Sequence, residues 1–401
     1  MLKIDKVYDA KSVLKDIIRK TDIIYANNLV SDNKIYLKTE NLQLTGSFKI
    51  RGSYYKISKL TAEEKSKGIV ACSAGNHAQG VALAAKENII PCTICMPDCA
   101  PLSKIEATKS YGAEVVLVEG AYDESYDCAK KLCTEKNMTF IHPFDDFDII
   151  AGQGTIGLEI LEQLDNVDAI VVPIGGGGLI SGVAFAAKSL KPSIKIYGVQ
   201  AQKASSMYKS FYENKLTAIH VASTFADGIA VKNPGINTFE IIKEYVDEII
   251  TVSEDEIAAS ILMLMEKQKI VAEGAGAVSV AAAVFNKIPL KNKNIVCIVS
   301  GGNIDINIID RVMSRGLLLS GRKTSFTISL EDKPGQLVAV AKVISDNGGN
   351  VVAVDYDNGD PDMDIKSCFI KITLETRNHQ HLNKIKQAMT ENGFRIVKER
   401  T

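Results

Sequence analysis

The stretch TGSFKIRGS, residues 45–53, places a lysine between two glycines, one three residues before it and one three residues after it. Such an amine is either a surface residue on an amphipathic helix, as most lysines are, or a nucleophile that attacks a carbonyl group. These nine residues do not decide between the two interpretations of Lys49. The decision depends on which other groups the chain can bring beside it.

The stretch SAGNHAQG, residues 73–80, lies between an apolar run and an alanine-rich helical pattern. Free N–H groups at the start of the predicted helix favour an anion such as a carboxylate. The simpler interpretation is an N-cap and a turn, which would need only one polar residue. Because several such residues follow one another, a binding site is as good an interpretation as a cap. The candidates, which we call the carboxylate loop, are Ser73, Ala74, Gly75, Asn76 and His77.

Four glycines and a leucine follow the apolar run IVVPI. Glycine destabilises ordinary secondary structure, so four together predict a backbone that approaches a ligand closely. With a helix N-terminus behind them, they are typical of a site for a phosphate group. This glycine loop consists of Gly175, Gly176, Gly177, Gly178 and Leu179.

Two other phosphate-binding patterns do not fit the glycine loop. The nearest G-x-G-x-x-G frame has Ser181 in its last place, and the following strand ends in Gln200 rather than in an acidic residue, which argues against a dinucleotide. No Gly-Lys-Ser/Thr follows, which argues against a P-loop. A single phosphate monoester fits better.

A third loop, SGGNID, again follows an apolar strand, and its Ser300 offers a neutral hydroxyl beside glycines that leave room for a flat ligand. A phosphate cradle, a carboxylate-binding helix start, this hydroxyl and the amine of Lys49 together make a complete site for pyridoxal phosphate. In such a site the lysine forms a Schiff base and the cofactor supplies an electron sink. The combination favours the reactive interpretation of Lys49.

The elements that position these loops follow from the hydrophobic pattern. From residue 60 onward, short apolar runs alternate with helical patterns, which predicts an α/β fold with parallel sheets covered on both faces. Ligands in such sheets bind at the carboxyl ends of strands. We expect residues 1–318 to form this region as two α/β subdomains, the smaller at about 50–145, and residues 319–324 to be a linker. Residues 325–401 follow the order βαββαβ, which predicts a ferredoxin-like α+β domain.

The composition narrows the class of protein. The 401 residues have a formal net charge of −1 and no long basic run, so we expect no nucleic-acid partner and no binding to an anionic membrane. The N-terminal residues contain no uninterrupted apolar segment, which predicts neither a signal peptide nor a membrane span, and hence a cytoplasmic protein. The eight cysteines are then expected to be reduced thiols. Cys92 and Cys95 have the spacing of a metal-binding pair, but a strand would direct them to opposite faces, so no metal is expected.

The motifs TGSFKIRGS, SAGNHAQG, AGQGTIGLEI, PIGGGGLISG, ADG, EGAGA and SGGNID, in this order, closely resemble the threonine dehydratases, also called threonine ammonia-lyases. These belong to the tryptophan-synthase-β-like class, or fold type II, of pyridoxal-phosphate enzymes. The resemblance covers roughly residues 5–315. The tail, with LEDKPGQL and NGGNVVAVDYDN, resembles an ACT domain, a module that binds small effectors.

The resemblance implies a role for each candidate residue. Lys49 carries pyridoxal 5'-phosphate, and Phe48 packs beside its ring. Asn76 contacts the ring's phenolic oxygen, and Ser300 contacts the pyridine nitrogen. The glycine loop holds the phosphate, and the carboxylate loop holds the substrate carboxylate.

The reaction that the resemblance implies is the deamination of L-threonine to 2-oxobutanoate and ammonia, with the freed amine of Lys49 as general base for the Cα proton. L-Serine is expected to react as well, because one missing methyl group costs only about 1–3 kcal/mol of discrimination. A role in isoleucine biosynthesis is one expectation, and a catabolic role stays open.

Two departures separate the chain from the related serine racemases. Those enzymes carry a second serine where this chain has Ala74, and its hydroxyl acts as a base on the other face of the ring, so its absence favours elimination. They also bind a divalent ion through acidic residues where this chain has Gln200 and Ser206, so no such ion is expected. An isomerase of serine remains one alternative. A non-catalytic amino-acid sensor is the other, and it would be expected to lose Lys49 or the glycine loop.

The ACT resemblance implies regulation by an amino acid or a nucleotide that binds between paired copies of the domain. The turn before the first helix of the tail suits a carboxylate, and Asn350 offers both a donor and an acceptor. The simpler interpretation is a plain turn and the first residue of a strand. The family usually forms dimers or tetramers, so we expect a homodimer or a homotetramer. The candidate effector residues are Asp332, Gly335, Gln336 and Asn350.

Overall fold

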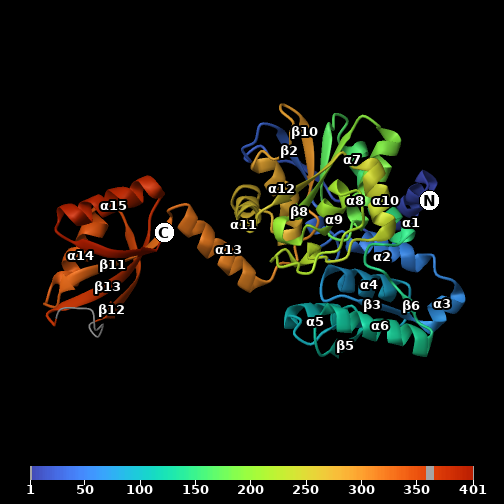
Figure 1. Cartoon of the computed structure of the whole chain (residues 1–401), viewed down its shortest axis with the longest axis horizontal. Coiled ribbons are helices and arrows are strands. Elements are labelled where there is room, and N and C mark those ends of the chain that lie inside the picture. Colours follow the sequence, from blue (N-terminus) through green and yellow to red (C-terminus); the bar gives the residue numbers. More distant parts are fainter. Residues whose placement is uncertain (1, 358–364, 401) are drawn as a thin grey trace. The chain divides into compact units, whose positions relative to one another are not determined.

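The computed structural model of the chain describes residues 2–357 and 365–400 (Figure 1). The chain divides into two compact units, Met1–Asp305 and Ile306–Thr401. The division lies before the boundary expected at residue 318, because helix α13 (Ile306–Leu319) belongs with the C-terminal unit. Only residues 320–322 separate α13 from strand β11 (Lys323–Glu331), so the rest of the stretch expected to be a linker, 319–324, belongs to these two elements.

The larger sheet of the first unit has six strands in the order β1-β2-β10-β7-β8-β9, and all neighbouring pairs run parallel except β1 and β2. All residues of the apolar run AIVVP in β7 are buried, because α7 and α8 cover one face of the sheet and α12 covers the other. The strands are β1 (Ile23–Tyr25), β2 (Lys34–Lys38), β7 (Ala169–Pro173), β8 (Lys195–Ala201), β9 (Glu248–Val252) and β10 (Asn294–Ile298). The helices around them are α1 (Ile4–Leu14), η1 (Glu40–Leu42), α7 (Phe147–Gln163), α8 (Gly178–Leu190), η2 (Gln202–Ala204), α9 (Ser206–Tyr212), η3 (Asp227–Ile229), α10 (Ile236–Tyr245), α11 (Glu254–Met263), η4 (Leu264–Gln268) and α12 (Gly274–Val284).

The smaller sheet of the first unit is parallel throughout, in the order β5-β4-β3-β6. Alternate residues of its strands enter different cores: Ile94 packs with α4, whereas Cys95 packs with α6. The same alternation separates Cys92 from Cys95, as expected, so the two thiols do not form a chelating pair. The elements are α2 (Lys49–Ser58), α3 (Ala62–Lys67), β3 (Ile69–Cys72), α4 (Asn76–Glu87), β4 (Cys92–Pro97), α5 (Leu102–Ser110), β5 (Glu114–Val118), α6 (Tyr122–Lys136) and β6 (Thr139–Phe140).

A cluster of four buried charged side chains, which we call the buried ion cluster, ties α2 to its neighbours. The guanidinium of Arg51, on α2, donates to Glu40 at 2.8 Å and to Glu159, on α7, at 2.6 Å. The ammonium of Lys38, on β2, donates to Glu159 at 2.6 Å. Two cations thus meet two anions, which is the condition for burying charge. Because Lys49 is the first residue of α2, these contacts also hold the backbone that carries it.

The C-terminal unit has the predicted order βαββαβ after α13. Its four strands form an antiparallel sheet in the order β12-β13-β11-β14, the ferredoxin-like arrangement. Alternate residues of β11, such as Phe326 and Ile328, face α14 and α15 and form a core of their own. No helix in the described parts of the chain is long and apolar enough to span a bilayer. The remaining elements are α14 (Gln336–Asp346), β12 (Asn350–Asp357), β13 (Ser367–Glu375), α15 (His379–Glu391) and β14 (Arg395–Arg400).

Candidate active site

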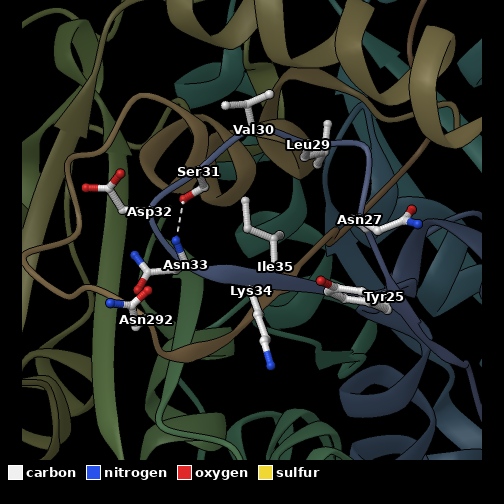
Figure 2. A pocket seen from close by; sticks show the side chains of 11 residues that line it. Tyr25, Asn27, Leu29, Val30, Ser31, Asp32, Asn33, Lys34, Ile35 and Asn292 are labelled. Atoms are coloured by element: carbon white, nitrogen blue, oxygen red, sulfur yellow. Dashed lines mark hydrogen bonds between the residues drawn. The ribbon is translucent and has the colours of Figure 1, made fainter.

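A cavity of about 830 Å³ lies in the first unit, where loops that follow strands of both sheets meet. It brings together every residue that the sequence assigned to the cofactor and the substrate carboxylate. A second cavity, of about 500 Å³, lies beside β2 and the loop before it, and contains none of them (Figure 2). The predicted residues that line the larger cavity are Phe48, Lys49, Ser73, Ala74, Gly75, Asn76, His77, Gly175, Gly176, Gly177, Gly178, Leu179 and Ser300.

Lys49, whose amine the sequence predicted to be a nucleophile, lines this cavity. Its Nζ donates to the carbonyl oxygen of Pro143 at 3.0 Å and lies 5.3 Å from the ring centroid of Phe48. Burial lowers the pKa of Lys49 to about 8, although the nearby carboxylate of Glu273 raises it. Roughly a tenth of the amine is therefore neutral, and hence nucleophilic, at pH 7, which is far more than for an exposed lysine.

The glycine loop is a cradle in which side chains have no room. A Cβ on Gly176 would lie 2.4 Å from the ring of Phe144, and Gly177 has a φ of +101°. The hydroxyl of Thr238 donates to the carbonyl oxygen of Gly176 at 2.7 Å and fixes the loop from behind. The loop opens α8, whose first N–H groups have no partner within the helix. This arrangement fits an anion of the size and charge of a phosphate.

The carboxylate loop opens α4 in the same way. A Cβ on Gly75 would meet no atom within 4 Å, so the space above the loop is open. The Ser73 hydroxyl accepts a hydrogen bond from the N–H of Gly75 at 3.1 Å. The imidazole of His77 is buried, with Nε2 3.0 Å from the carbonyl oxygen of Ile141, and burial together with Lys49 lowers its pKa to about 3. His77 can therefore offer a carboxylate its backbone N–H, whereas its side chain is neutral and occupied.

Ser300 supplies an uncharged hydroxyl to the cavity wall. The side chain is buried, and its Oγ donates to the carbonyl oxygen of Ala275 at a long 3.4 Å. A better-placed acceptor could therefore receive this hydrogen bond instead. Its own carbonyl oxygen accepts from the N–H of Phe48 at 3.1 Å, which links the strand end to the lysine segment. An amine, an anion cradle and a neutral hydroxyl in one cavity fit pyridoxal phosphate.

The sequence did not single out the acidic residues of the cavity, of which Glu273 lies against a predicted site residue; the others are Asp123, Asp145 and Asp227. Glu273, in the motif EGAGA, is buried, and its carboxylate accepts a hydrogen bond from Asn76 Nδ2 at 2.7 Å. Burial and the charge of Asp227 raise its pKa to about 7, against the opposing effects of Asn76 and nearby lysines. A lone acidic residue before a helix of small residues was the available signal, but the motif entered only as part of the family pattern.

The two positions compared with a racemase metal site make hydrogen bonds within the protein. The amide of Gln200 donates to Ile174 and accepts from the N–H of Tyr208 at 2.7 Å, and Ser206 donates to Val231 at 2.8 Å. Among residues 2–357 and 365–400, no three histidine, cysteine or acidic side chains gather as metal ligands would. The expectation of a metal-free enzyme stays a prediction.

The candidate effector residues lie in the C-terminal unit, at the two ends of α14. Gly335 has a φ of +93° and turns the chain into that helix, and Asp332 just before it accepts from the hydroxyl of Tyr356 at 2.7 Å. Asn350 begins β12 and donates to a carboxylate of β13 at 3.0 Å. Since Tyr356 follows Asn350 by six positions on β12, Asn350 and Asp332 are separated by about 20 Å along the strand. One copy of the unit therefore brings Asp332, Gly335 and Gln336 together but not Asn350.

The chain is similar to known proteins in sequence and in structure. Residues 14–301 match the model of a family described as pyridoxal-phosphate dependent enzyme, and residues 320–391 match that of an ACT domain. An L-threonine ammonia-lyase of Thermotoga maritima is 46% identical over 398 residues, which are 99% of each chain. The structure of threonine deaminase isoform 2 from Solanum lycopersicum, 38% identical, has a TM-score of 0.74 and covers 77% of this chain and 87% of that one. The structure of maize serine racemase, 35% identical, also has a TM-score of 0.74 and covers 79% and 98%.

Proposed function

This chain belongs to the family of pyridoxal-phosphate-dependent enzymes, and we propose that it deaminates L-threonine to 2-oxobutanoate and ammonia, with regulation through its ACT domain. The observation that carries the proposal is the meeting of Lys49, the glycine loop and Ser300 in one cavity. The likeness to a threonine ammonia-lyase over 99% of both chains supports the choice of substrate.

Each group of residues in the cavity has a separate role in the proposed reaction. When bound, pyridoxal phosphate supplies an electron sink that acidifies the Cα proton of the amino acid. The amine of Lys49, with a pKa of about 8, accepts that proton as a general base. The carboxylate loop holds the substrate carboxylate, and the glycine loop binds the phosphate. Ser300 would donate an uncharged hydrogen bond to the pyridine nitrogen, which would then need no proton of its own.

The decisive experiment is an assay of 2-oxobutanoate formation by the purified protein with pyridoxal phosphate and L-threonine. Lys49→Ala should abolish both the visible absorbance of the bound cofactor and the production of ketoacid. Lys86→Ala removes an exposed lysine of α4 and should behave like the parent protein. A parent protein that binds the cofactor but forms no ketoacid from threonine would refute the proposed reaction.

L-Serine is the second substrate that we propose, with pyruvate as its product. Ala74 lines the cavity where the related racemases carry a serine, so the chain lacks that second base. The product should therefore contain pyruvate and no D-serine, which chiral chromatography of the reaction measures. D-serine in more than trace amounts would favour the racemase interpretation, which the likeness to maize serine racemase keeps open.

We further propose that the enzyme works in the cytoplasm as a homodimer or homotetramer and binds an amino acid or a nucleotide at its ACT domain. The separation of Asn350 from Asp332 supports a paired arrangement, because a site that uses both needs two copies. Sedimentation measurements give the oligomeric state. Titration of isoleucine, valine and AMP against ketoacid formation identifies the effector and the sign of its effect.

A further inference from the structure

A chain of side-chain hydrogen bonds that the proposed reaction does not use holds Asn76. Asn303 Nδ2 donates to Asn76 Oδ1 at 2.8 Å, and Asn76 Nδ2 donates to Glu273 Oε1 at 2.7 Å. The three residues come from three segments: the loop after β10, the start of α4 and the residue before α12. They are far apart in sequence and meet only at the wall of the cavity.

One backbone carbonyl fixes the orientation of both amides. Asn303 Nδ2 also donates to the carbonyl oxygen of Thr45 at 2.7 Å, and a carbonyl oxygen can only accept. The nitrogen of Asn303 must therefore face Thr45, and its second hydrogen faces Asn76. The oxygen of Asn76 must then face Asn303, which leaves its nitrogen toward Glu273. An amide that could otherwise turn over by 180° is thus held in one orientation.

Asn76 Nδ2 carries two hydrogens, and Glu273 takes one of them. In the part of the chain that the structure describes, no acceptor is found for the other, and Asn76 lines the cavity that contains Lys49. We propose that Asn303 is a positioning residue that acts through Asn76 to present this remaining N–H to an oxygen of the bound cofactor. The inference rests on the proposed function, since it needs a cofactor in this cavity.

Two glycines border the three side chains, and neither has room for a Cβ. Gly46 has a φ of +69°, and a Cβ there would lie 2.3 Å from Asn303 Oδ1. A Cβ on Gly301 would lie 2.3 Å from Glu273 Oε1 and 3.1 Å from Asn76 Nδ2. Any side chain at either glycine would displace a member of the network. The glycine three residues before Lys49 is thereby explained by its closeness to Asn303.

The first test replaces the amide donor of Asn303 by an acceptor of the same shape. In Asn303→Asp, a carboxylate oxygen faces two oxygen acceptors, so Asn76 loses its fixed orientation. We expect the dissociation constant of pyridoxal phosphate to rise about tenfold, as the loss of a hydrogen bond to a charged group implies. The absorption spectrum of the bound cofactor should also change, which a purely structural role of Asn303 would not cause.

The matched control is Asn33→Asp. Asn33 Nδ2 donates to the carbonyl oxygen of Leu290 at 2.8 Å and also joins distant segments, but Asn33 borders the second cavity (Figure 2). The dissociation constant of pyridoxal phosphate and the absorption spectrum of the bound cofactor should be the same in Asn33→Asp as in the parent protein. Denaturation of both apoproteins in urea separates any loss of stability from the loss of cofactor binding.

A double-mutant cycle tests whether Asn303 acts through Asn76, and it avoids the added charge. Asn303→Ala should weaken cofactor binding in the parent but have no further effect in Asn76→Ala, because the residue that it positions is already gone. Additive effects, or an unchanged spectrum and affinity in both Asn303 variants, would overturn the inference. A parent protein that binds no pyridoxal phosphate would instead overturn the proposed function, so the two failures are distinguishable.

Discussion

Lys49 and Glu273 are two ionisable side chains of the cavity, and each affects the pKa of the other. Burial lowers the pKa of Lys49 to about 8 and raises the pKa of Glu273 to about 7. Each charge also favours the other, because the carboxylate raises the pKa of the amine and the ammonium lowers that of the carboxyl group. Near pH 8 about half of the amine is therefore neutral, whereas an exposed lysine, with a pKa near 10.4, is almost entirely a cation.

The first prediction concerns the pH dependence of cofactor capture. Only the neutral amine attacks the aldehyde, so the rate at which apoprotein captures pyridoxal phosphate should rise with pH and level off above about 8. Glu273→Gln removes the carboxylate that raises the pKa of Lys49, so the midpoint should move to lower pH. Glu87→Gln, at the exposed end of α4, should leave it unchanged. Absorbance in a rapid-mixing experiment measures the rate, and a midpoint near 10 would contradict the assigned environment of Lys49.

The second prediction concerns Ser300, the uncharged hydroxyl in the cavity wall. Ser300→Asp would place a carboxylate where the hydroxyl now lies and would favour a protonated pyridine nitrogen. We expect an altered absorption spectrum of the bound cofactor and slower or less faithful elimination. The control is Ser66→Asp, because Ser66 lies exposed on α3. A buried serine such as Ser279 would be unsuitable, since the added charge would destabilise the fold. Parent-like spectra and turnover in Ser300→Asp would show that Ser300 does not contact the nitrogen.

At the scale of elements, the position of Lys49 depends on α2, and α2 is held by the buried ion cluster. The Arg51 guanidinium is fully buried between two carboxylates, and Lys38 balances the second of them. Removing one partner of a buried ion pair leaves an uncompensated charge, which costs far more than the intact pair contributes. The cluster therefore specifies where α2 packs against α7.

The third prediction follows from that asymmetry. Arg51→Met should lower the free energy of unfolding by about 3–5 kcal/mol, because two buried carboxylates lose their shared cation. Lys67→Met removes the exposed partner of Glu63 on α3 and should leave the urea midpoint nearly unchanged. Urea titration of the apoproteins by circular dichroism gives both values. A loss in Arg51→Met no larger than that in Lys67→Met would show that the cluster does not hold α2.

Most of the elements could be predicted from the sequence, because their hydrophobic patterns are local. The alternation of buried strands and helices, the capping box from Thr61 to Glu64 and the βαββαβ order of the tail all have short-range signals. The network of Asn303, Asn76 and Glu273 has none, since its members are joined only by the meeting of three separate segments. The grouping of α13 with the C-terminal unit was not predicted. The polar residues after α13 are typical of a linker between domains, although they form a short turn between α13 and β11.

At the scale of the whole molecule, the two units have separate hydrophobic cores. The candidate active-site residues all lie in the first unit and the candidate effector residues all lie in the second. In this assignment neither site contributes a side chain to the other. An effector can therefore alter activity only through a conformational change whose equilibrium depends on both effector and substrate binding. Catalysis and regulation should consequently be separable by truncation.

The fourth prediction is the outcome of that truncation. A chain that ends at Leu319 lacks the ACT domain but keeps the whole first unit and α13. It should bind pyridoxal phosphate, form 2-oxobutanoate from L-threonine and show no response to effectors. Absorbance of the bound cofactor and the ketoacid assay measure these properties, with the full chain as control. A truncated enzyme that responds as well as the full chain would place the effector site outside residues 320–401.

The fifth prediction tests the effector residues without removing a domain. Asn350 is exposed, and it lies about 20 Å along β12 from the residue that contacts Asp332, so its amide would serve an effector held by a second copy. Asn350→Ala should raise the half-maximal effector concentration while turnover without effector stays within about twofold, as for an ordinary surface substitution. Asn392→Ala removes another exposed amide of the same unit, bonded to the carbonyl oxygen of Ala388 at 2.8 Å, and should change neither quantity. If isoleucine, valine and AMP leave the full chain unaffected, or if both variants respond like the parent, Asn350 has no part in regulation.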